Sequence, residues 1–502
     1  MAEATNILLI TSDQQHWMTL GCLNEAIQTP NLDRLAAQGM LMNRAYCPNP
    51  TCTPTRASII TGQYPSQHGA YSLGTKLSED AHTVGEDFQA AGYRTALVGK
   101  AHFQPTKTHE TWSSIESMPI LQDLDFWRNF HGPFYGFEHV ELARNHADEQ
   151  LVGQHYVIWM EENGCDNWRD YFRPPTGNNA RQKHTWGIPE KYHYGTWIAE
   201  RSCALLEHYA REDEPFFLWA SFFDPHPPYL VPEPWDKMYD PGALAVPSVV
   251  EGEHDNNPPH FQMTQMAKPD FSDWREEEWG LHGMSSHVHD KEEMAKNLAI
   301  YYAMVSLMDK QIGQILDRLD ALGLTENTLV VVTSDHGHFY GQHGLIAKGP
   351  FHYEDVIRVP FLVRQPGTVP AGVRSEAIQS LVDLAPSFLS AAGLDIPRCM
   401  TGVDQSDVWR GRADSARDHA VVEHHHSPTT VHVKTYVESR YKLTTYFQRD
   451  FGELFDLVND PDEHHNRWDD PEYKDLKYEL IHKLLFAEMG KEPMWMPRIS
   501  GA

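Results

Sequence analysis

Four short apolar runs, each followed by polar residues, constrain the fold of this chain more than any other feature. They occupy residues 6–11, 95–98, 216–219 and 329–332. Short apolar runs with polar flanks are typical of strands that a parallel sheet buries on both faces. Helical patterns lie between them, for example over 31–38, where Leu32 and Leu35 share a face and Gly39 follows.

This alternation predicts an α/β fold with a large, mainly parallel, doubly wound sheet flanked by helices. In such sheets ligands bind beyond the carboxyl ends of the strands. A chain of 502 residues has room for more than one domain. We predict a catalytic domain over 1–410 and a smaller C-terminal α+β subdomain over 411–502, where shorter β-like runs replace the alternation. Regions near 104–190 and 230–290 lack a sustained period and are predicted to be long inserts over the site.

The charge balance limits the partners of the chain. Seventy acidic and 41 basic side chains give a net charge of −29, which opposes binding to nucleic acid or anionic membranes. An anionic substrate therefore needs a local basic pocket. The sequence contains no apolar stretch of about 18 residues, and 6–10 has the pattern of a core strand rather than of a signal peptide. We predict a cytoplasmic protein that has no nucleic-acid or membrane partner.

Cys52 stands out among six cysteines that show no CxxC spacing, so neither a zinc ribbon nor a disulfide framework is indicated. The segment Cys52-Thr53-Pro54-Thr55-Arg56 fits the pattern C-x-P-x-R and leads into a helical run that ends near Gly62. With Pro54 at the first helical position, Cys52 would lie at the helix N-terminus. Free backbone N–H groups and the helix dipole favour an anion there.

The motif resembles that of the sulfatases of the alkaline phosphatase superfamily, in which a maturation enzyme oxidises the cysteine to formylglycine (3-oxoalanine). Further segments match the family in order and approximate spacing. They are the first strand with Asp13, residues 29–35 (TPNLDRL), 99–102 (GKAH), 334–337 (SDHG), 453–457 (ELFDL) and 459–461 (NDP). The resemblance covers most of the chain. It implies hydrolysis of a small-molecule sulfate monoester and maturation by a formylglycine-generating enzyme.

The resemblance also implies the catalytic roles. Oxidised Cys52 hydrates to a geminal diol, one hydroxyl of which binds the metal and attacks sulfur, while loss of the other proton later expels sulfate. Arg56 holds the diol and the metal ligands. A sulfate monoester spreads one negative charge over its oxygens, so cations must neutralise it before an anion attacks. Lys100 is expected to contact the sulfate oxygens, and His102 to orient or deprotonate the diol.

Two further residues are assigned to the leaving group by the same resemblance. His226, in the segment Asp224-Pro225-His226, matches the histidine that contacts the leaving-group oxygen. Lys348 matches the lysine that bridges sulfate and leaving group.

One divalent metal ion is implied, with ligands Asp13, Gln14, Cys52, Asp335 and His336. The commoner sulfatase pattern has Asp at position 14 and Asn at position 336. Gln14 and His336 make this site less anionic and softer, which favours Mn²⁺ over Ca²⁺.

Two other functions remain open. A phosphonate monoester or phosphodiester hydrolase of the same superfamily also uses formylglycine with Gln and His at the metal. In that group Tyr and Thr replace the Lys-x-His pair, so Lys100 and His102 favour the sulfatase. A non-catalytic homologue would keep Cys52 as a thiol, and intact mass would reveal it. The sequence leaves the leaving-group alcohol undetermined, and the C-terminal segment with Met494, Trp495 and Met496 is a candidate contact in a homo-oligomer.

Overall fold

The large sheet of the predicted fold is present in the computed structural model, which describes residues 5–144, 151–172, 184–274, 282–427, 431–492 and 494–501. Its nine strands are mostly parallel. In spatial order they are β11 (Arg358–Val359), β2 (Met40–Tyr46), β12 (Phe361–Arg364), β8 (Thr328–Ser334), β1 (Asn6–Ser12), β6 (Phe216–Ser221), β3 (Arg94–Gly99) and β4 (His139–Leu142), with β13 (Val373–Ser380) paired to β2. The four predicted apolar runs form the adjacent parallel strands β8, β1, β6 and β3.

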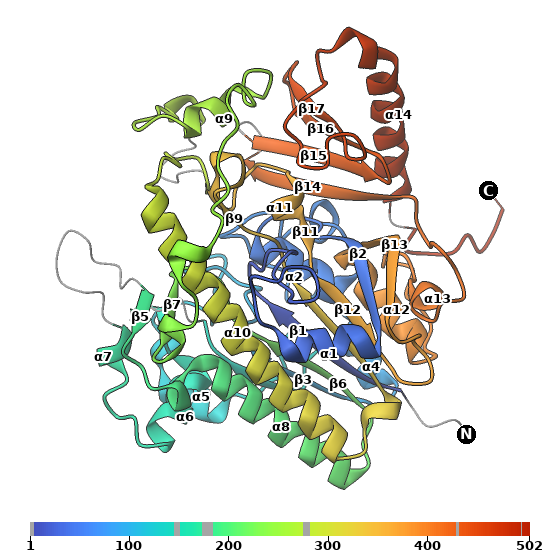
Figure 1. The fold of residues 1–502 in the computed structure, drawn as a ribbon. Helices are drawn as coiled ribbons and strands as arrows, with labels where there is room; N and C mark the ends of the chain where they lie inside the picture. The colour runs from blue at the N-terminus through green and yellow to red at the C-terminus, as the bar shows by residue number, and fades with distance from the viewer. Residues whose placement is uncertain are drawn as a thin grey trace.

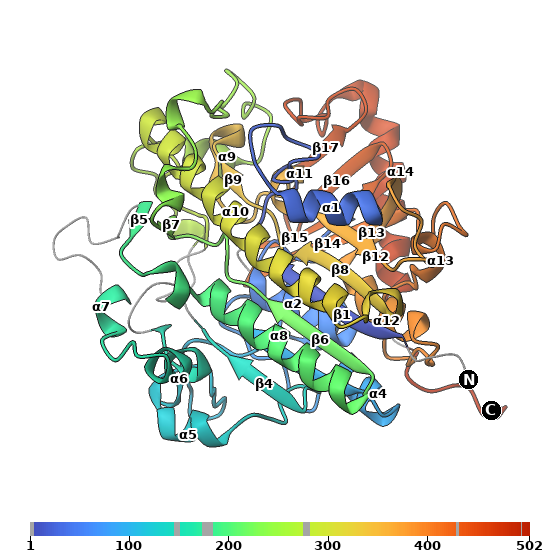
Figure 2. The ribbon, with the colours of Figure 1, turned by 60° about the horizontal axis from the view of Figure 1, so that its bottom comes forward.

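Alternate side chains of each central strand enter different cores, as the twofold repeat of a strand requires. Ile7 and Leu9 of β1 pack on one face with α2 (Cys52–Thr61), α4 (Val84–Ala90) and α12 (Leu384–Ala391). Leu8 and Ile10 pack on the other face with α1 (Pro30–Gln38), α6 (Gln154–Glu162), α8 (Tyr194–Glu212) and α10 (Lys291–Ala321). Figure 2 shows α8 and α10 running side by side across this second face. The sheet is therefore the middle layer of three.

Most of the described helices are short, and the two longest, α8 and α10, cover one face of the large sheet. Their bounds are α1 (Pro30–Gln38), α2 (Cys52–Thr61), α3 (Pro65–His68), α4 (Val84–Ala90), α5 (Leu124–Asn129), α6 (Gln154–Glu162), α7 (Arg169–Phe172), α8 (Tyr194–Glu212), α9 (Pro259–Thr264), α10 (Lys291–Ala321), α11 (Glu354–Ile357), α12 (Leu384–Ala391), α13 (Ser406–Trp409) and α14 (Lys474–Gly490). The helix predicted over 31–38 is α1, with Pro30 as its first residue.

The C-terminal region forms a separate four-stranded antiparallel sheet with α14 against it (Figure 1). Its strands are β14 (His419–Ser427), β15 (Val431–Glu438), β16 (Tyr441–Tyr446) and β17 (Gly452–Asp456). This is the predicted α+β character. The boundary predicted at residue 410 stays a prediction.

The predicted insert ranges contain short elements. Within 104–190, β4 pairs in parallel with β3 and so belongs to the large sheet. Strand β5 (His184–Trp186) of the first range pairs with β7 (Leu230–Pro232) of the second. Outside both ranges, β9 (Phe339–Tyr340) pairs with β10 (Ile346–Ala347). Parts of the insert ranges, 145–150, 173–183 and 275–281, lie outside the described residues.

The cysteines and the apolar character of the helices are the subject of two further sequence expectations. All six cysteines lie in the described part of the chain and are free. Among the described residues, no helix combines the length and the apolar character that a membrane crossing requires.

Candidate active site

The carboxyl ends of four parallel strands bring the predicted site residues to one edge of the large sheet. Ser12 of β1 pairs with Ser334 of β8, so Asp13 and Asp335 leave the sheet side by side. Gly99 of β3 pairs with Ser221 of β6, and Lys100 N donates to Ser221 O at 3.0 Å. Parallel strands end at a common edge, which is why residues hundreds of positions apart meet here.

Helix α2 carries Cys52 to the same edge. All ten of its residues are buried, and Gly62 ends it in the left-handed conformation with φ 63°. The helix begins at Cys52 and not at Pro54, so the predicted start was wrong by two residues. Proline is tolerated throughout a first helical turn because the first four N–H groups have no partner within the helix. Cys52 still lies at the N-terminal end, as predicted.

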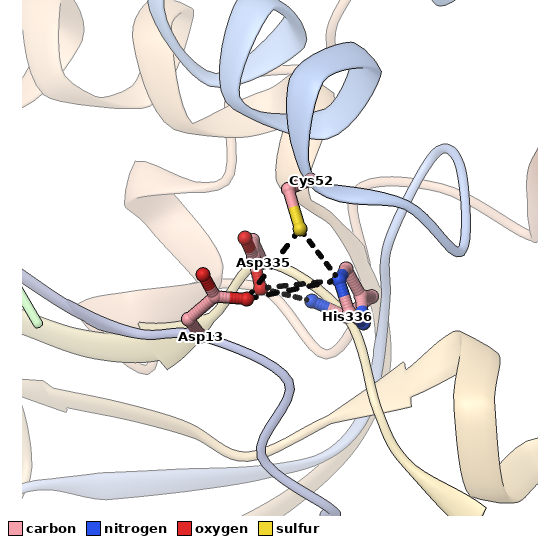
Figure 3. A group of neighbouring side chains, drawn as sticks. All are labelled: Asp13, Cys52, Asp335 and His336. Carbon is pink, nitrogen blue, oxygen red and sulfur yellow. Dashed lines mark hydrogen bonds and ion pairs between the residues drawn. The ribbon is translucent and has the colours of Figure 1, made fainter. Parts of the chain in front are cut away.

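The side chains of Asp13, Cys52, Asp335 and His336 converge on one point (Figure 3). One potential ligand atom from each lies within 4.8 Å of the others, and all four residues are buried. Cys52 Sγ is 3.5 Å from Asp13 Oδ1 and 3.2 Å from His336 Nε2. His336 Nδ1 donates to Gly337 O at 2.9 Å, which leaves the lone pair of the ring on Nε2, toward the cluster. Two carboxylates and an imidazole suit a divalent cation.

Gln14 lies beside this cluster with its backbone in the left-handed region at φ 66°. Its N–H donates to Asp335 Oδ1 at 3.0 Å, and its side-chain nitrogen is 2.7 Å from His338 Nδ1. The amide oxygen is buried and accepts no hydrogen bond from any described residue. A buried oxygen without a donor costs free energy unless a cation or water satisfies it, so Gln14 fits the predicted ligand set.

Three cationic side chains surround Cys52 and the carboxylates. Arg56 Nε donates to Asp335 Oδ2 at 2.8 Å, and Lys348 Nζ lies 3.0 Å from Cys52 Sγ. Lys100 Nζ forms an ion pair with Asp13. Burial alone would raise the pKa of Asp13, as does the nearby Cys52, but Lys100, His226 and Arg56 bring it down to about 2. The cations of the site therefore stabilise the ionised form of the Asp13 carboxylate.

The two predicted catalytic histidines contact Cys52 from other loops. Desolvation by burial lowers the pKa of both His102 and His226, and it outweighs the hydrogen bonds that the two histidines donate to Cys52, which act to raise both values. His226 Nδ1 lies 2.6 Å from Pro227 O and donates to it, which leaves Nε2 for proton exchange. The structure thus brings together all ten predicted site residues: Asp13, Gln14, Cys52, Arg56, Lys100, His102, His226, Asp335, His336 and Lys348.

A model of a known protein family matches most of this chain. The model of the sulfatase family matches residues 5–394. The chain belongs to the sulfatase family. The model of the C-terminal part of N-sulphoglucosamine sulphohydrolase matches residues 341–489 of this sulfatase.

Known relatives agree in length as well as in sequence. An arylsulfatase of Clostridium perfringens is 29% identical to this sulfatase over 509 residues, which cover 97% of this chain and 95% of the relative. Two solved structures share the fold. A phosphonate monoester hydrolase of Silicibacter pomeroyi has a TM-score of 0.78 at 22% identity, and the match covers 98% of this chain and 96% of the hydrolase. The structure of BT4656 in complex with its substrate, D-glucosamine-2-N,6-O-disulfate, has a TM-score of 0.73 at 20% identity. The match covers 98% of this chain and 99% of BT4656. The protein is a sulfuric ester hydrolase.

The sequence interpretation missed a buried ion pair that supports the sulfatase site. Glu116 accepts hydrogen bonds from His102 N at 2.9 Å and Gln104 N at 3.2 Å, and Arg144 NH1 donates to it at 2.7 Å. Both charged side chains are about 2% exposed. Glu116 thereby holds the loop that carries Lys100 and His102. Both residues lie in the first insert range, where no motif marked them.

Two other residues near the nucleophile were also missed. Ser221, at the end of β6, accepts from Arg56 NH1 at 2.7 Å. The pKa of His282 is lowered to about 3, by burial first and then by Lys348, while Cys52 opposes the shift. The side chain of His282 is exposed to solvent. Only their position near Cys52 identifies these residues.

Proposed function

We propose that this sulfatase hydrolyses a small-molecule sulfate monoester with a formylglycine nucleophile made from Cys52. The supporting observation is the surroundings of that side chain. Cys52 begins α2, and Lys348 Nζ, His336 Nε2 and Asp13 Oδ1 lie 3.0, 3.2 and 3.5 Å from its sulfur. A nucleophile in this position lies at a helix N-terminus, among cations, and beside potential metal ligands.

Different residues of the chain act on the nucleophile, on the sulfate group and on the leaving group. Oxidation of Cys52 produces an aldehyde, whose hydrate attacks sulfur through one hydroxyl. Lys100 and Lys348 neutralise the sulfate oxygens, so that the anionic ester can be approached. His226, protonated at Nε2, gives this proton to the departing alcohol, and the proton that the attacking hydroxyl releases to solvent balances the one that His226 regains. His102 takes the proton of the second hydroxyl, and the C–O bond to sulfate then breaks as the aldehyde re-forms.

The family implies one divalent metal ion, and the residues here fit it. Asp13, Asp335, His336, the Gln14 amide oxygen and the modified residue 52 would hold the ion. When bound, it would stabilise negative charge on the nucleophile and on the sulfuryl oxygens. We propose Mn²⁺ as the first choice and Ca²⁺ as the second, because one imidazole and two carboxylates are softer and less anionic than an all-oxygen set with three carboxylates.

Mass spectrometry tests the nucleophile directly. The tryptic peptide that contains Pro54 and Thr55 should carry CHO in place of CH₂SH at position 52. The Cys52→Ala variant should lose several orders of magnitude in kcat while its thermal unfolding stays close to that of the wild type. Fully active enzyme that contains only unmodified cysteine at this position would refute the proposal.

A second activity, on phosphonate monoesters or phosphodiesters, is supported by Gln14 and His336 at the metal site. Lys100 and His102 support sulfate as the preferred substrate. A screen of aryl, carbohydrate and choline sulfates beside a phenylphosphonate ester would rank these substrates. A higher kcat/KM on the phosphonate than on every sulfate would reverse the order proposed here.

Three further partner and location proposals accompany this function. The enzyme would need a formylglycine-generating enzyme for maturation, and we place it in the cytoplasm. Homo-oligomer formation is supported by the C-terminal segment, in which Met494, Trp495 and Met496 are exposed by 71%, 62% and 68%. Light scattering of the full chain and of a Trp495→Ser variant would test this contact.

A further inference from the structure

A second group of potential metal ligands shares no residue with the Cys52 site. It consists of Glu253, His343 and His464, and one ligand atom from each lies within 4.8 Å of the other two. Glu253 belongs to the second insert range, and His343 lies in the turn between β9 and β10. His464 follows β17 of the C-terminal sheet. Three parts of the chain that are distant in sequence therefore meet here.

The spacing of these atoms resembles an edge of a tetrahedral metal site. His343 Nδ1 is 3.3 Å from Glu253 Oε1, and His464 Nδ1 is 3.1 Å from the other carboxylate oxygen, Oε2, to which it is hydrogen-bonded. Two ligand atoms bound tetrahedrally to Zn²⁺ at about 2.0–2.1 Å lie about 3.3 Å apart. Glu253 and His343 have side chains exposed by only 1% and 4%.

Two of the buried atoms lack hydrogen-bond partners. Within the described part of the chain, neither Glu253 Oε1 nor His343 Nδ1 makes a hydrogen bond, although the two face each other. Oε2 of the same carboxylate is satisfied, since Val250 N donates to it at 2.8 Å. The unsatisfied oxygen and nitrogen thus point at a common space, as two ligands of one ion would.

The surroundings of His343 orient its ring for this role. Asp355 Oδ2 lies 3.4 Å from His343 Nε2, on the opposite side of the ring from Glu253. Tyr353 stacks on the imidazole with ring centroids 3.6 Å apart and an angle of 6° between the planes. A carboxylate near the distal nitrogen is typical of a histidine that binds metal, and the stacked Tyr353 ring holds the plane of the imidazole.

We propose that Glu253, His343 and His464 bind a second divalent transition-metal ion, with Zn²⁺ preferred. Two imidazole nitrogens and one carboxylate suit zinc, and water would complete a four-coordinate site. His464 is 30% exposed, so the ion can enter from solvent.

The ion would stabilise the fold and support the active site. It would join the second insert, the catalytic core and the C-terminal sheet, closing long loops of the chain. Asp355 also lies 2.9 Å from His16 Nε2, and its backbone carbonyl accepts from His338 N at 2.9 Å. His338 in turn contacts Gln14. The second site is thereby connected to both loops that carry predicted ligands of the catalytic metal.

The competing state of this cluster is an ion-pair network without metal. Burial opposes protonation of His343, but the facing carboxylates of Asp355 and Glu253 outweigh burial and raise the pKa of His343 to about 9. A proton and a metal ion would compete for the same ring.

Zinc content measured on matched variants separates the two states. Wild type, His464→Ala and His465→Ala would be dialysed against buffered Zn²⁺ and analysed by inductively coupled plasma mass spectrometry. His465 is the control because it is adjacent, 66% exposed and outside the cluster. Any zinc in the Cys52 site is common to all three proteins. We expect His464→Ala to contain about one equivalent less zinc than the other two.

Thermal unfolding and a second variant complete the test. Added Zn²⁺ should raise the Tm of wild type and His465→Ala by several degrees and leave that of His464→Ala unchanged. Glu253→Gln should behave as His464→Ala does. Equal zinc content in wild type, His464→Ala and Glu253→Gln would overturn the proposal in favour of the ion-pair network, whatever the catalytic activity.

Discussion

Cys47 and Cys52 are both completely buried, yet the pKa values of their thiols shift in opposite directions. Burial raises the pKa of Cys47 well above its ordinary value, and the charge of Asp335 adds to the increase. Burial has the same effect on Cys52, but Lys100, Lys348 and His336 outweigh it and lower the pKa strongly. At the scale of single residues, the position of nearby cations therefore decides which cysteine can become a nucleophilic site.

Replacing His226 should affect poor leaving groups most. A proton from His226 matters little when the departing nitrophenolate is already stable, but an alkoxide needs it. We expect His226→Ala to lower kcat/KM by about 100-fold or more on alkyl sulfates and much less on nitrophenyl sulfate. Steady-state kinetics on a matched substrate pair measures the difference, and equal losses on both would contradict the assignment.

Gln14 should affect the relative affinity of the site for Ca²⁺ and Mn²⁺. Gln14→Asp adds a third carboxylate to the predicted ligand set, which favours the harder ion. We expect the ratio of Ca²⁺ to Mn²⁺ affinity to rise by about tenfold or more relative to wild type. This ratio is measured by metal analysis of the purified protein, followed by removal of the metal with a chelator and titration with Ca²⁺ or Mn²⁺. The proposed preference is wrong if the wild-type protein contains stoichiometric Ca²⁺ and Mn²⁺ does not restore the activity of the metal-free enzyme.

At the scale of elements, the site depends on loops held just beyond the ends of rigid strands. Strands β8, β1, β6 and β3 end together, and the residues after them include the predicted metal ligands and cationic side chains. The loop after β3 is less regular, since His102 has a left-handed φ of 59°. Backbone conformations of this kind persist where surrounding contacts hold them. Glu116 supplies such contacts through two backbone N–H groups.

Weakening the Glu116 anchor should slow catalysis without removing any predicted catalytic group. In Glu116→Gln the buried Arg144 loses its carboxylate, and the loop that carries Lys100 and His102 loses a charged acceptor. We expect kcat/KM to fall by about 10- to 100-fold, because a small displacement of reacting groups has effects of this size.

Glu79→Gln is the matched control for this variant. Its carboxylate also accepts from Gln104, at 3.3 Å, but is 64% exposed. Activity and Tm close to wild type are expected for the control. Equal activity of the two variants would show that Glu116 does not position the loop.

At the scale of the whole molecule, the buried carboxylate of Glu423 joins the C-terminal sheet to the catalytic core by hydrogen bonds. Glu423 of β14 accepts from Ser66 N and Ser66 Oγ of α3, both at 2.8 Å, and pairs with Lys434 and Lys491. Burial alone would raise the pKa of Glu423, but Lys491, Lys434 and Ser66 lower it from 4.5 to about 2. A removed partner would leave buried charge behind.

The stability of the molecule should depend on this carboxylate in a defined pH range. The folded pKa lies below the unfolded one, so the contribution is complete above about pH 4.5 and is lost as the pH falls toward 2. We expect Glu423→Gln to lower the free energy of unfolding at pH 7 by about 3 kcal/mol. The difference from wild type should shrink as the pH is lowered below 4.5.

Glu438→Gln is the control, because the partner of Glu438, Lys483, is 38% exposed and such pairs contribute little. Denaturant unfolding between pH 3 and 8 measures both variants. A constant difference between Glu423→Gln and wild type across this range would contradict the linkage.

Much of the architecture could be predicted because the signals are local. Apolar runs of strand length and the periodicity of α1 depend on neighbouring residues, and they identified the central strands and their common edge. The C-x-P-x-R motif and the spacing of Asp13, Lys100, Asp335 and Lys348 identified the family and the site. The sequence alone thus determined which chemistry the chain can perform. The cytoplasmic location, the homo-oligomer and the boundary at residue 410 stay predictions.

Only the tertiary structure decided which distant side chains support that chemistry. The start of α2 shifted to Cys52, because a helix end depends on its tertiary surroundings and a first-turn proline fits several positions. Glu116 meets Arg144, and Glu253 meets His343 and His464, across segments without periodicity or motif. Such pairs form because burial excludes water and leaves each charge dependent on whichever partner the fold brings near. Nothing in the local sequence of either partner encodes that proximity.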